Sequence, residues 1–147
     1  MAPILKLSRK IIIIRLFIIF QPRKLLVVLP DCDEDGVPKS VRTPSGESRG
    51  ALLGSLNADE NFDDAHPDGY TVYQSKDPVF ENGNYRLNFK GRVSVPSVKN
   101  FQLVRKDNIH DIICQFGKVG DDRFHLDFKY PLNAFQAFSL ALCQFNL

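Results

Sequence analysis

The 147-residue sequence contains no tryptophan, a single methionine and only three cysteines. Cys32, Cys114 and Cys143 lie far apart and include no C-x-x-C pair, which argues against a disulfide framework and against a cysteine zinc site. Because unpaired cysteine usually packs as a small apolar residue, we expect three buried thiols. This cysteine usage fits a reducing, intracellular compartment.

The sequence also lacks a strong excess of charge, since its formal net charge is +2. So small an excess does not by itself indicate a nucleic-acid partner, and any basic surface has to be local. In contrast, 12 phenylalanines and an apolar fraction of 44% predict a globular protein. The length suits one domain, with phenylalanine supplying most of the aromatic packing.

Signatures of catalysis are missing as well. The chain has no G-x-S-x-G, Walker or G-x-G-x-x-G motif, and no pair of carboxylates stands out from ordinary surface charge. The three histidines, His66, His110 and His125, form no H-x-x-x-H pair, so we expect them to be surface or packed residues. The sequence therefore predicts a protein that is not an enzyme, with no catalytic residues and no cofactor.

One acidic stretch, DCDEDG at residues 31–36, resembles the first half of an EF-hand loop. Its second half does not fit, because Lys39 and Arg42 occupy the ninth and twelfth positions, where the loop needs oxygen ligands. The flanking sequence is not helical either, since Pro38 and Pro44 follow. We expect a solvated acidic loop and no metal site.

The segment 1–20 joins a basic start to the apolar run IIIIRLFIIF. Arg15 splits this run, which is shorter than the roughly 20 residues that a membrane-spanning helix needs. Its isoleucines suit a buried strand. A targeting or membrane-surface segment and a misassigned start of the coding sequence remain the alternatives.

Most of the remaining chain shows strand patterns separated by turn residues. The polar segment 31–69 is expected to be a long loop. The Asn-Gly pair within ENGN (81–84) predicts a tight hairpin turn, and Gly91 makes a β-bulge plausible. The predicted strands are 25–29, 70–74, 85–89, 91–95, 100–104, 111–116 and 123–128, with a turn at 119–122. Such short, regular spacing predicts an antiparallel sheet that curls or closes.

The C-terminal segment 131–146 is predicted to be a helix, with Pro131 in its first turn. Apolar residues cover nearly its whole circumference, and a helix that is apolar all round has to be buried all round. At about 22 Å it is too short to cross a membrane. We therefore expect it to fill the inside of a β-barrel.

Two stretches, LNFKGRVSVPSVKNFQL (87–103) and QFGKVGDDRFHLDFKYPLNAFQAFSLALCQF (115–145), resemble the C-terminal end of the Tubby-like domain. QPRKLLVVLP (21–30) is more weakly similar to a strand of the same family. The resemblance implies a mainly β fold with one helix (α+β), a partial antiparallel β-barrel around a buried hydrophobic C-terminal helix. Residues 21–147 would be the C-terminal part of a Tubby-like domain truncated at its N-terminal half, with residues 1–20 unmatched.

The same resemblance implies a non-enzymatic, phosphoinositide-binding adaptor at membranes, acting in trafficking or signalling and often at cilia. The family's headgroup-binding cations come from the earlier half of the domain, and no position of this sequence matches them. The candidates for a headgroup site are therefore basic residues of this chain itself. Such residues are equally typical of the solvent-exposed face of a barrel. They are Lys90, Arg92, Lys99, Arg23 and Lys24.

Other functions stay open at this point. The family resemblance also allows a transcription regulator that binds nucleic acid, although the weak net charge and the lack of a recognition helix argue against it. A protein-interaction module using an exposed sheet edge is the third class, and trafficking proteins are possible partners. An incomplete barrel wall would leave the helix partly exposed, as an apolar patch for a partner chain. The expected location is cytoplasmic, peripheral at the plasma or ciliary membrane, or nuclear; the sequence does not indicate an oligomeric state.

Overall fold

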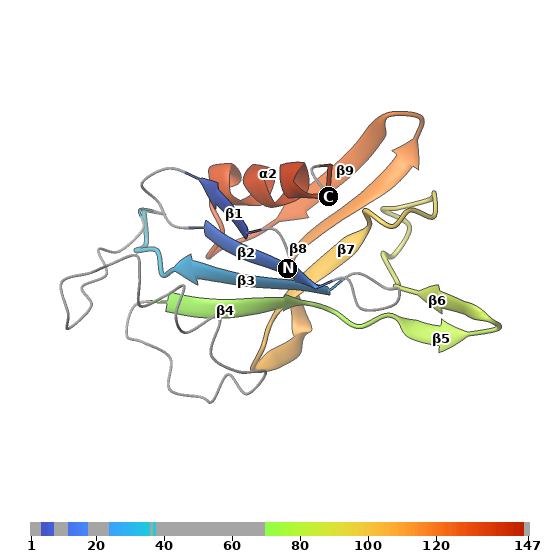
Figure 1. The fold of residues 1–147 in the computed structure, drawn as a ribbon, viewed down its shortest axis with the longest axis horizontal. Helices are drawn as coiled ribbons and strands as arrows, with labels where there is room; N and C mark the ends of the chain where they lie inside the picture. Colours follow the sequence, from blue (N-terminus) through green and yellow to red (C-terminus); the bar gives the residue numbers. More distant parts are fainter. Residues whose placement is uncertain (1–3, 8–11, 18–23, 36, 38–69, 146–147) are drawn as a thin grey trace.

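The computed structural model describes residues 4–7, 12–17, 24–35, 37 and 70–145. Antiparallel strands make up most of this part of the chain, and its one α-helix lies near the C-terminus (Figure 1). The elements are β1 (Ile4–Leu7), β2 (Ile12–Phe17), β3 (Lys24–Pro30), β4 (Tyr70–Ser75), β5 (Val79–Glu81), β6 (Asn84–Arg86), β7 (Phe101–Arg105), β8 (Asn108–Gly120), β9 (Arg123–Phe128) and α2 (Ala134–Cys143).

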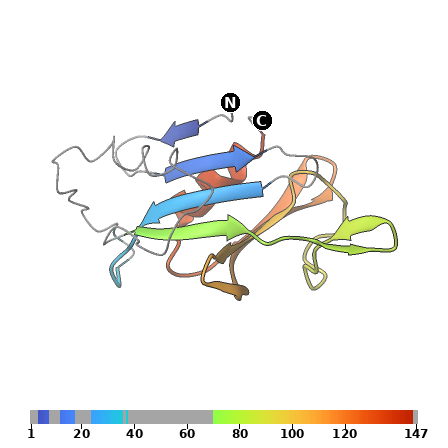
Figure 2. The same cartoon turned by 60° about the horizontal axis from the view of Figure 1, so that its bottom comes forward.

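Seven strands form one antiparallel sheet in the order β1-β2-β3-β4-β7-β8-β9, and β5 and β6 form a separate hairpin (Figure 2). The apolar run LLVVL is confirmed as a strand, and β3 pairs with β4 with Val28 opposite Val72. For the N-terminal segment, the strand interpretation agrees with β1 and β2. Most of the expected polar loop, residues 38–69, lies outside the described part.

The hairpin predicted from the Asn-Gly pair is confirmed. Asn82 and Gly83 have φ angles of 51° and 80°. These left-handed values are what a two-residue type I′ turn requires, and Glu81 pairs with Asn84 across it. The hairpin β5–β6 extends away from the main sheet (Figure 1).

The predicted strands at 85–89 and 91–95 are wrong beyond Arg86. The segment 87–100, called here the 87–100 loop, contains no strand. Lys90 and Gly91 adopt φ angles of 49° and 80°, and the backbone N–H of Arg92 donates to the carbonyl of Phe89 at 3.0 Å. Two successive left-handed residues make a tight turn here, so the alternating pattern does not continue as a barrel wall.

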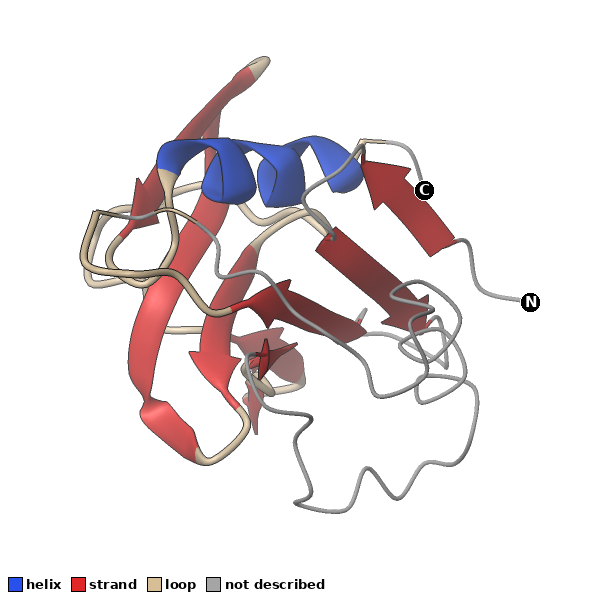
Figure 3. Cartoon of the chain, turned by 90° about the vertical axis from the view of Figure 1, so that its left-hand side faces the viewer, coloured by secondary structure: helices blue, strands red, loops and turns tan. Residues whose placement is uncertain are grey.

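The helix begins later than expected, because Asn133 is its N-cap and α2 starts at Ala134. Asn133 and Gln136 form a reciprocal capping box, in which each side chain accepts a hydrogen bond from the other residue's backbone N–H. The predicted first turn at Pro131 and the end at residue 146 are therefore corrected. α2 lies across the curved sheet (Figure 3).

Only one side of α2 is buried. Ala137, Leu140 and Ala141 belong to the same core as Leu103 of β7 and Ile113 of β8. The opposite side is a stripe of exposed apolar residues, with fractional exposures of 54% for Phe135, 59% for Phe138, 46% for Leu142 and 49% for Phe145. These four residues are called the α2 stripe.

The expectation that the helix is buried all round is therefore wrong. β1 and β9 are the two edges of the seven-stranded sheet, and no closed barrel is found among the described residues. A sheet that stays open can cover one face of a helix, whereas burial of the other face needs a second layer. The mainly β fold with one helix is confirmed, whereas the partial barrel around that helix is not.

Candidate functional site

A chain of polar side chains ties the 87–100 loop to the sheet. Gln102, buried in β7, donates from Nε2 to the carbonyl of Asn88 at 2.9 Å and to Oε1 of Gln115 at 3.2 Å. Gln115 in turn donates to Oδ2 of Asp127 at 2.9 Å, and Asp127 accepts two bonds from Arg92. Because each buried amide finds partners, this network fixes the loop at low energetic cost.

Arg92 and Asp127 form a bidentate pair at the end of this network. The guanidinium Nε lies 3.0 Å from Oδ2, and Nη2 lies 2.7 Å from Oδ1. Hydrogen bonding from Arg92 is the main cause that lowers the pKa of Asp127 from 3.8 to about 2. The same hydrogen bond raises the pKa of Arg92. Arg92 is thus held by a carboxylate of the chain itself and positions the loop.

The second half of the loop rests on β8. Asn100 donates from Nδ2 to the carbonyl of Val95 at 2.9 Å and accepts from the backbone N–H of Lys118 at 2.9 Å. Val93 lies directly over Gly117, where a Cβ built on the glycine would be 2.3 Å from Cγ2 of Val93. Gly117 therefore provides the space that the loop needs against the strand.

The described members of the five predicted ligand-binding residues have different neighbours. Lys90 is exposed at the tip of its turn, and its backbone N–H donates to Asn88. Nζ of Lys99 lies 5.6 Å from the ring centroid of Phe145, a cation–π distance. Lys24 opens β3 and its Nζ lies 3.0 Å from Asp77. Arg23 lies outside the described residues.

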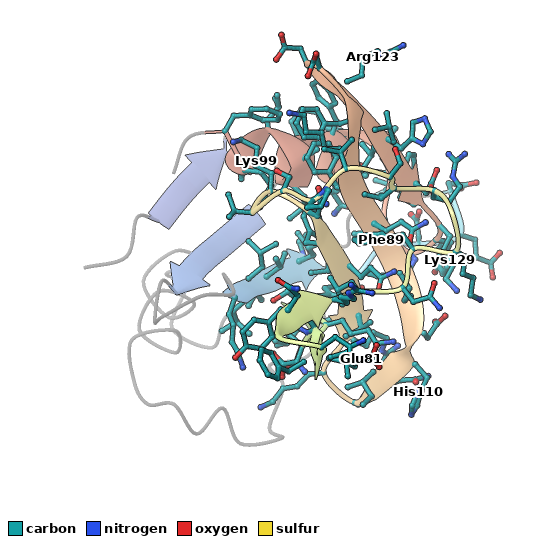
Figure 4. The ribbon with its side chains drawn as sticks, turned by 90° about the vertical axis from the view of Figure 1, so that its right-hand side faces the viewer. Glu81, Phe89, Lys99, His110, Arg123 and Lys129 are labelled. Carbon is teal, nitrogen blue, oxygen red and sulfur yellow. The ribbon has the colours of Figure 1, made fainter. Side chains whose placement is uncertain are left out.

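An open cleft of about 1090 Å³ lies between the hairpin β5–β6, the 87–100 loop and β7, and we call it the hairpin cleft. Figure 4 looks at this end of the molecule, with Glu81 labelled on the hairpin and Lys99 labelled near α2. Lys76 and Arg86 are the charged residues that line the cleft. Neither forms a salt bridge with any described residue.

Sequence reasoning missed Lys76 and Arg86. Both flank the hairpin that the Asn-Gly pair predicts, since Lys76 precedes β5 and Arg86 ends β6. Two cations at the base of one predicted hairpin are neighbours in space, and this is the signal that could have identified them. They could not be grouped with Lys90 and Lys99 without knowing how the 87–100 loop folds back.

The described side chains offer little for catalysis. Burial raises the pKa of the Cys114 thiol to about 12 and that of Cys143 to about 11, so both thiols stay protonated and unreactive near neutral pH. All three cysteines are buried thiols, as predicted. His125 has its Nδ1 2.8 Å from the carbonyl of Arg92, in a structural contact.

The described residues contain neither a metal-binding cluster nor a membrane-spanning helix. Within the described ranges, no group of three or more histidine, cysteine and acidic side chains could hold a metal ion. No helix in this part of the chain is long and apolar enough to cross a membrane. At the start of the DCDEDG stretch, Asp33 accepts the backbone N–H groups of Asp35 and Val37. Its carboxylate thus closes a local turn.

The Tub family model matches residues 15–147, and the chain belongs to this family. It is 39% identical over 127 residues to "Protein king tubby 2" of Culex quinquefasciatus, covering 85% of this chain and 28% of the relative. It is 42% identical to "Protein king tubby 1" of Aedes aegypti, with coverage of 85% and 29%. With "Tubby-related protein 1" of Mus musculus the identity is 39%, with coverage of 85% and 22%.

The chain thus spans less than a third of the length of these curated relatives. Proteins of the Tub family are not known as enzymes. This agrees at the family level with the absence of a catalytic motif in the sequence. The activities and partners of the longer relatives are therefore only proposed for this chain.

Proposed function

We propose that this chain is a non-enzymatic, phosphoinositide-binding adaptor that associates with membranes in trafficking or signalling. Membership of the Tub family carries the proposal. Its setting would be the cytoplasmic face of the plasma or ciliary membrane, with trafficking proteins as further partners. Binding would be electrostatic capture of a multiply charged headgroup, without a chemical step.

The distribution of unpaired cations supports this mechanism. Lys90 and Lys99 lie in the 87–100 loop, and neither forms a salt bridge with a described residue. A lysine near an anionic bilayer contributes about 1 kcal/mol of attraction. Two such residues on one loop therefore add to a useful, although not tight, membrane affinity.

The remaining candidates are expected to contribute less. Arg92 donates two of its five N–H groups to Asp127, and this carboxylate offsets the charge that Arg92 would present to a phosphate. Lys24 is paired with Asp77, but both side chains are largely exposed, so this pair is weak and a phosphate could compete for the lysine. We therefore rank Lys90 and Lys99 first for mutation.

The proposal predicts that the purified chain sediments with phosphatidylcholine vesicles only when they contain phosphatidylinositol bisphosphate. Replacing both lysines, Lys90→Gln and Lys99→Gln, should weaken this binding roughly thirtyfold, because each charge contributes about fivefold. Arg123→Gln is the control for loss of a cation elsewhere, and it removes one charge where the double variant removes two. Arg123 is an exposed cation after the β8–β9 turn, away from Lys99 in Figure 4, and its replacement should leave binding unchanged.

Three other outcomes of this experiment would contradict headgroup capture by the 87–100 loop. A soluble chain that ignores the phosphoinositide refutes the lipid-binding proposal. Equal losses per charge removed, about thirtyfold for the double variant and about fivefold for Arg123→Gln, would mean that net charge, rather than the loop, decides binding. Sedimentation without any lipid would mean that the chain self-associates through exposed apolar surface.

A protein-interaction module is the second candidate, and the α2 stripe is the observation that favours it. Phe135, Phe138 and Leu142 follow the i, i+3, i+7 spacing of one helix face, Phe145 follows just after the C-cap, and all four are about half exposed. An amphipathic partner could cover such a face. If vesicle binding fails and the chain stays soluble, this candidate takes the place of the first.

A further inference from the structure

The walls of the hairpin cleft are mostly apolar. On the hairpin side, Phe80 pairs with Tyr85 across the strands, and their ring centroids are 5.0 Å apart. Both rings line the cleft, and both are more than half exposed to solvent. Phe89 of the 87–100 loop and Phe101 of β7 line it as well. An exposed aromatic pair facing a groove leaves a large apolar area without a partner.

Among the described residues, the charges that line the cleft are all of one sign. Lys76 and Arg86 line it, whereas no described aspartate or glutamate does. Glu81, the acidic residue of the hairpin, is not one of the residues that line the cleft. Because the two cations have no salt bridge with a described residue, the cleft is complementary to an anion.

A polar group beneath the cleft also lacks a partner. Gln144, at the C-cap of α2, lines the cleft and is 2% exposed. Its Nε2 is buried and finds no hydrogen-bond acceptor among the residues that the structure describes. Leaving such a donor unpaired costs free energy, so an acceptor supplied by a ligand would be favoured there. The terminal torsion of a glutamine is soft, which lets the amide turn toward an oxygen placed in the cleft.

From these three features we infer that the hairpin cleft binds a single-chain anionic amphiphile of the fatty-acid class. The carboxylate lies against Lys76 and Arg86 and accepts a hydrogen bond from Nε2 of Gln144, since all three residues line the cleft. The alkyl chain lies along the aromatic wall formed by Phe80 and Tyr85. A guanidinium suits a carboxylate because it can donate two parallel hydrogen bonds. The volume of about 1090 Å³ is large enough for a medium-length chain.

This site is separate from the proposed headgroup surface. Neither Lys90 nor Lys99 lines the cleft, and the ligand is a dissolved monomer rather than a bilayer. The inference therefore does not depend on phosphoinositide binding. Each can fail while the other holds.

Isothermal titration of the full chain with decanoate, below its micelle concentration, tests the inference. We expect saturable binding of one decanoate. Two analogues should bind at least about tenfold more weakly than decanoate. Acetate has the carboxylate but lacks the alkyl chain, and decylammonium has the alkyl chain but carries the opposite charge. The double variant Lys76→Gln/Arg86→Gln should lose about tenfold or more in decanoate affinity, because its two cations are removed. These side chains form no salt bridges within the described part, so we expect the variant to fold normally.

Two further variants complete the test. Lys90→Gln/Lys99→Gln is the matched control with the same change of charge, and it should bind decanoate like the wild type. Gln144→Met keeps the shape of the side chain but removes the amide, and it should weaken decanoate without unfolding the chain, as circular dichroism would verify. Binding of decylammonium as tight as that of decanoate would overturn the inference. So would the absence of decanoate binding, or equal affinities in the two double variants.

Discussion

Replacing Leu140 with alanine should destabilise the chain by about 3 kcal/mol, the usual cost of emptying a buried leucine site. Leu140 is 1% exposed and packs in the core shared by α2 and the sheet. Phe138, two residues earlier on the same helix, is 59% exposed. Phe138→Ala should therefore change the free energy of unfolding by less than about 1 kcal/mol, although it removes the larger side chain.

Urea denaturation followed by circular dichroism measures both changes, and the slope with urea shows whether each variant still unfolds from a similar native state. The contrast between the two sites is the decisive result. If Phe138→Ala costs as much as Leu140→Ala, the outer face of α2 is covered in solution. The helix would then be buried all round, as the sequence pattern alone suggested.

Gly117→Ala should destabilise the chain by about 1 to 3 kcal/mol, which is typical of overpacking. The added methyl group would lie 2.3 Å from Cγ2 and 2.6 Å from Cγ1 of Val93, so the 87–100 loop or β8 has to move. The same change elsewhere on a strand often has little cost. The expected loss comes from this single close contact between loop and strand.

Val93→Ala removes the two methyl groups that the new Cβ would meet and serves as the rescuing partner. In the Gly117→Ala/Val93→Ala double variant we expect most of the stability lost by Gly117→Ala to return, measured by thermal or urea unfolding in a double-mutant cycle. Strictly additive effects would contradict the account, because they would mean that Val93 does not rest on Gly117 and that the loop lies elsewhere.

Much of the sheet could be predicted because its signals are local. The run LLVVL became β3, RFHLDF became β9, and the Asn-Gly pair became a two-residue turn with both residues left-handed. In each case, side-chain alternation or turn chemistry acts within a few residues. Asn100 and Gln102, within the family motif, also have a structural role. Their side chains donate hydrogen bonds to backbone carbonyls of the 87–100 loop.

The 87–100 loop was harder to predict because its pattern competes with its turn. Phe89 and Val93 alternate with polar residues as in a strand, yet the Lys90-Gly91 step takes the left-handed conformation and folds the chain back. Glycine favours such a turn, but a lysine at positive φ gives no clear signal in the sequence. The pairing of Arg92 with Asp127 was equally hidden, because it joins residues on separate segments.

The exposure of α2 and the position of the cleft depend on tertiary contacts. The apolar circumference of the helix predicted full burial, but whether each face finds a partner depends on how far the sheet extends around it. Lys76 and Arg86 are ordinary cations in the sequence and gain a common role only when the hairpin folds. Such features need the arrangement of whole elements, which no short motif specifies.

Competition by a soluble headgroup tests the central claim most directly. The chain would be bound to vesicles that contain phosphatidylinositol bisphosphate, and free inositol trisphosphate would then be added at increasing concentration. The proposed capture of a headgroup predicts that the chain is released into the supernatant, while an equal ionic strength of sodium chloride releases much less of it. If the chain stays on the vesicles at saturating inositol trisphosphate, headgroup recognition is not what holds it there, and the phosphoinositide-binding function is refuted.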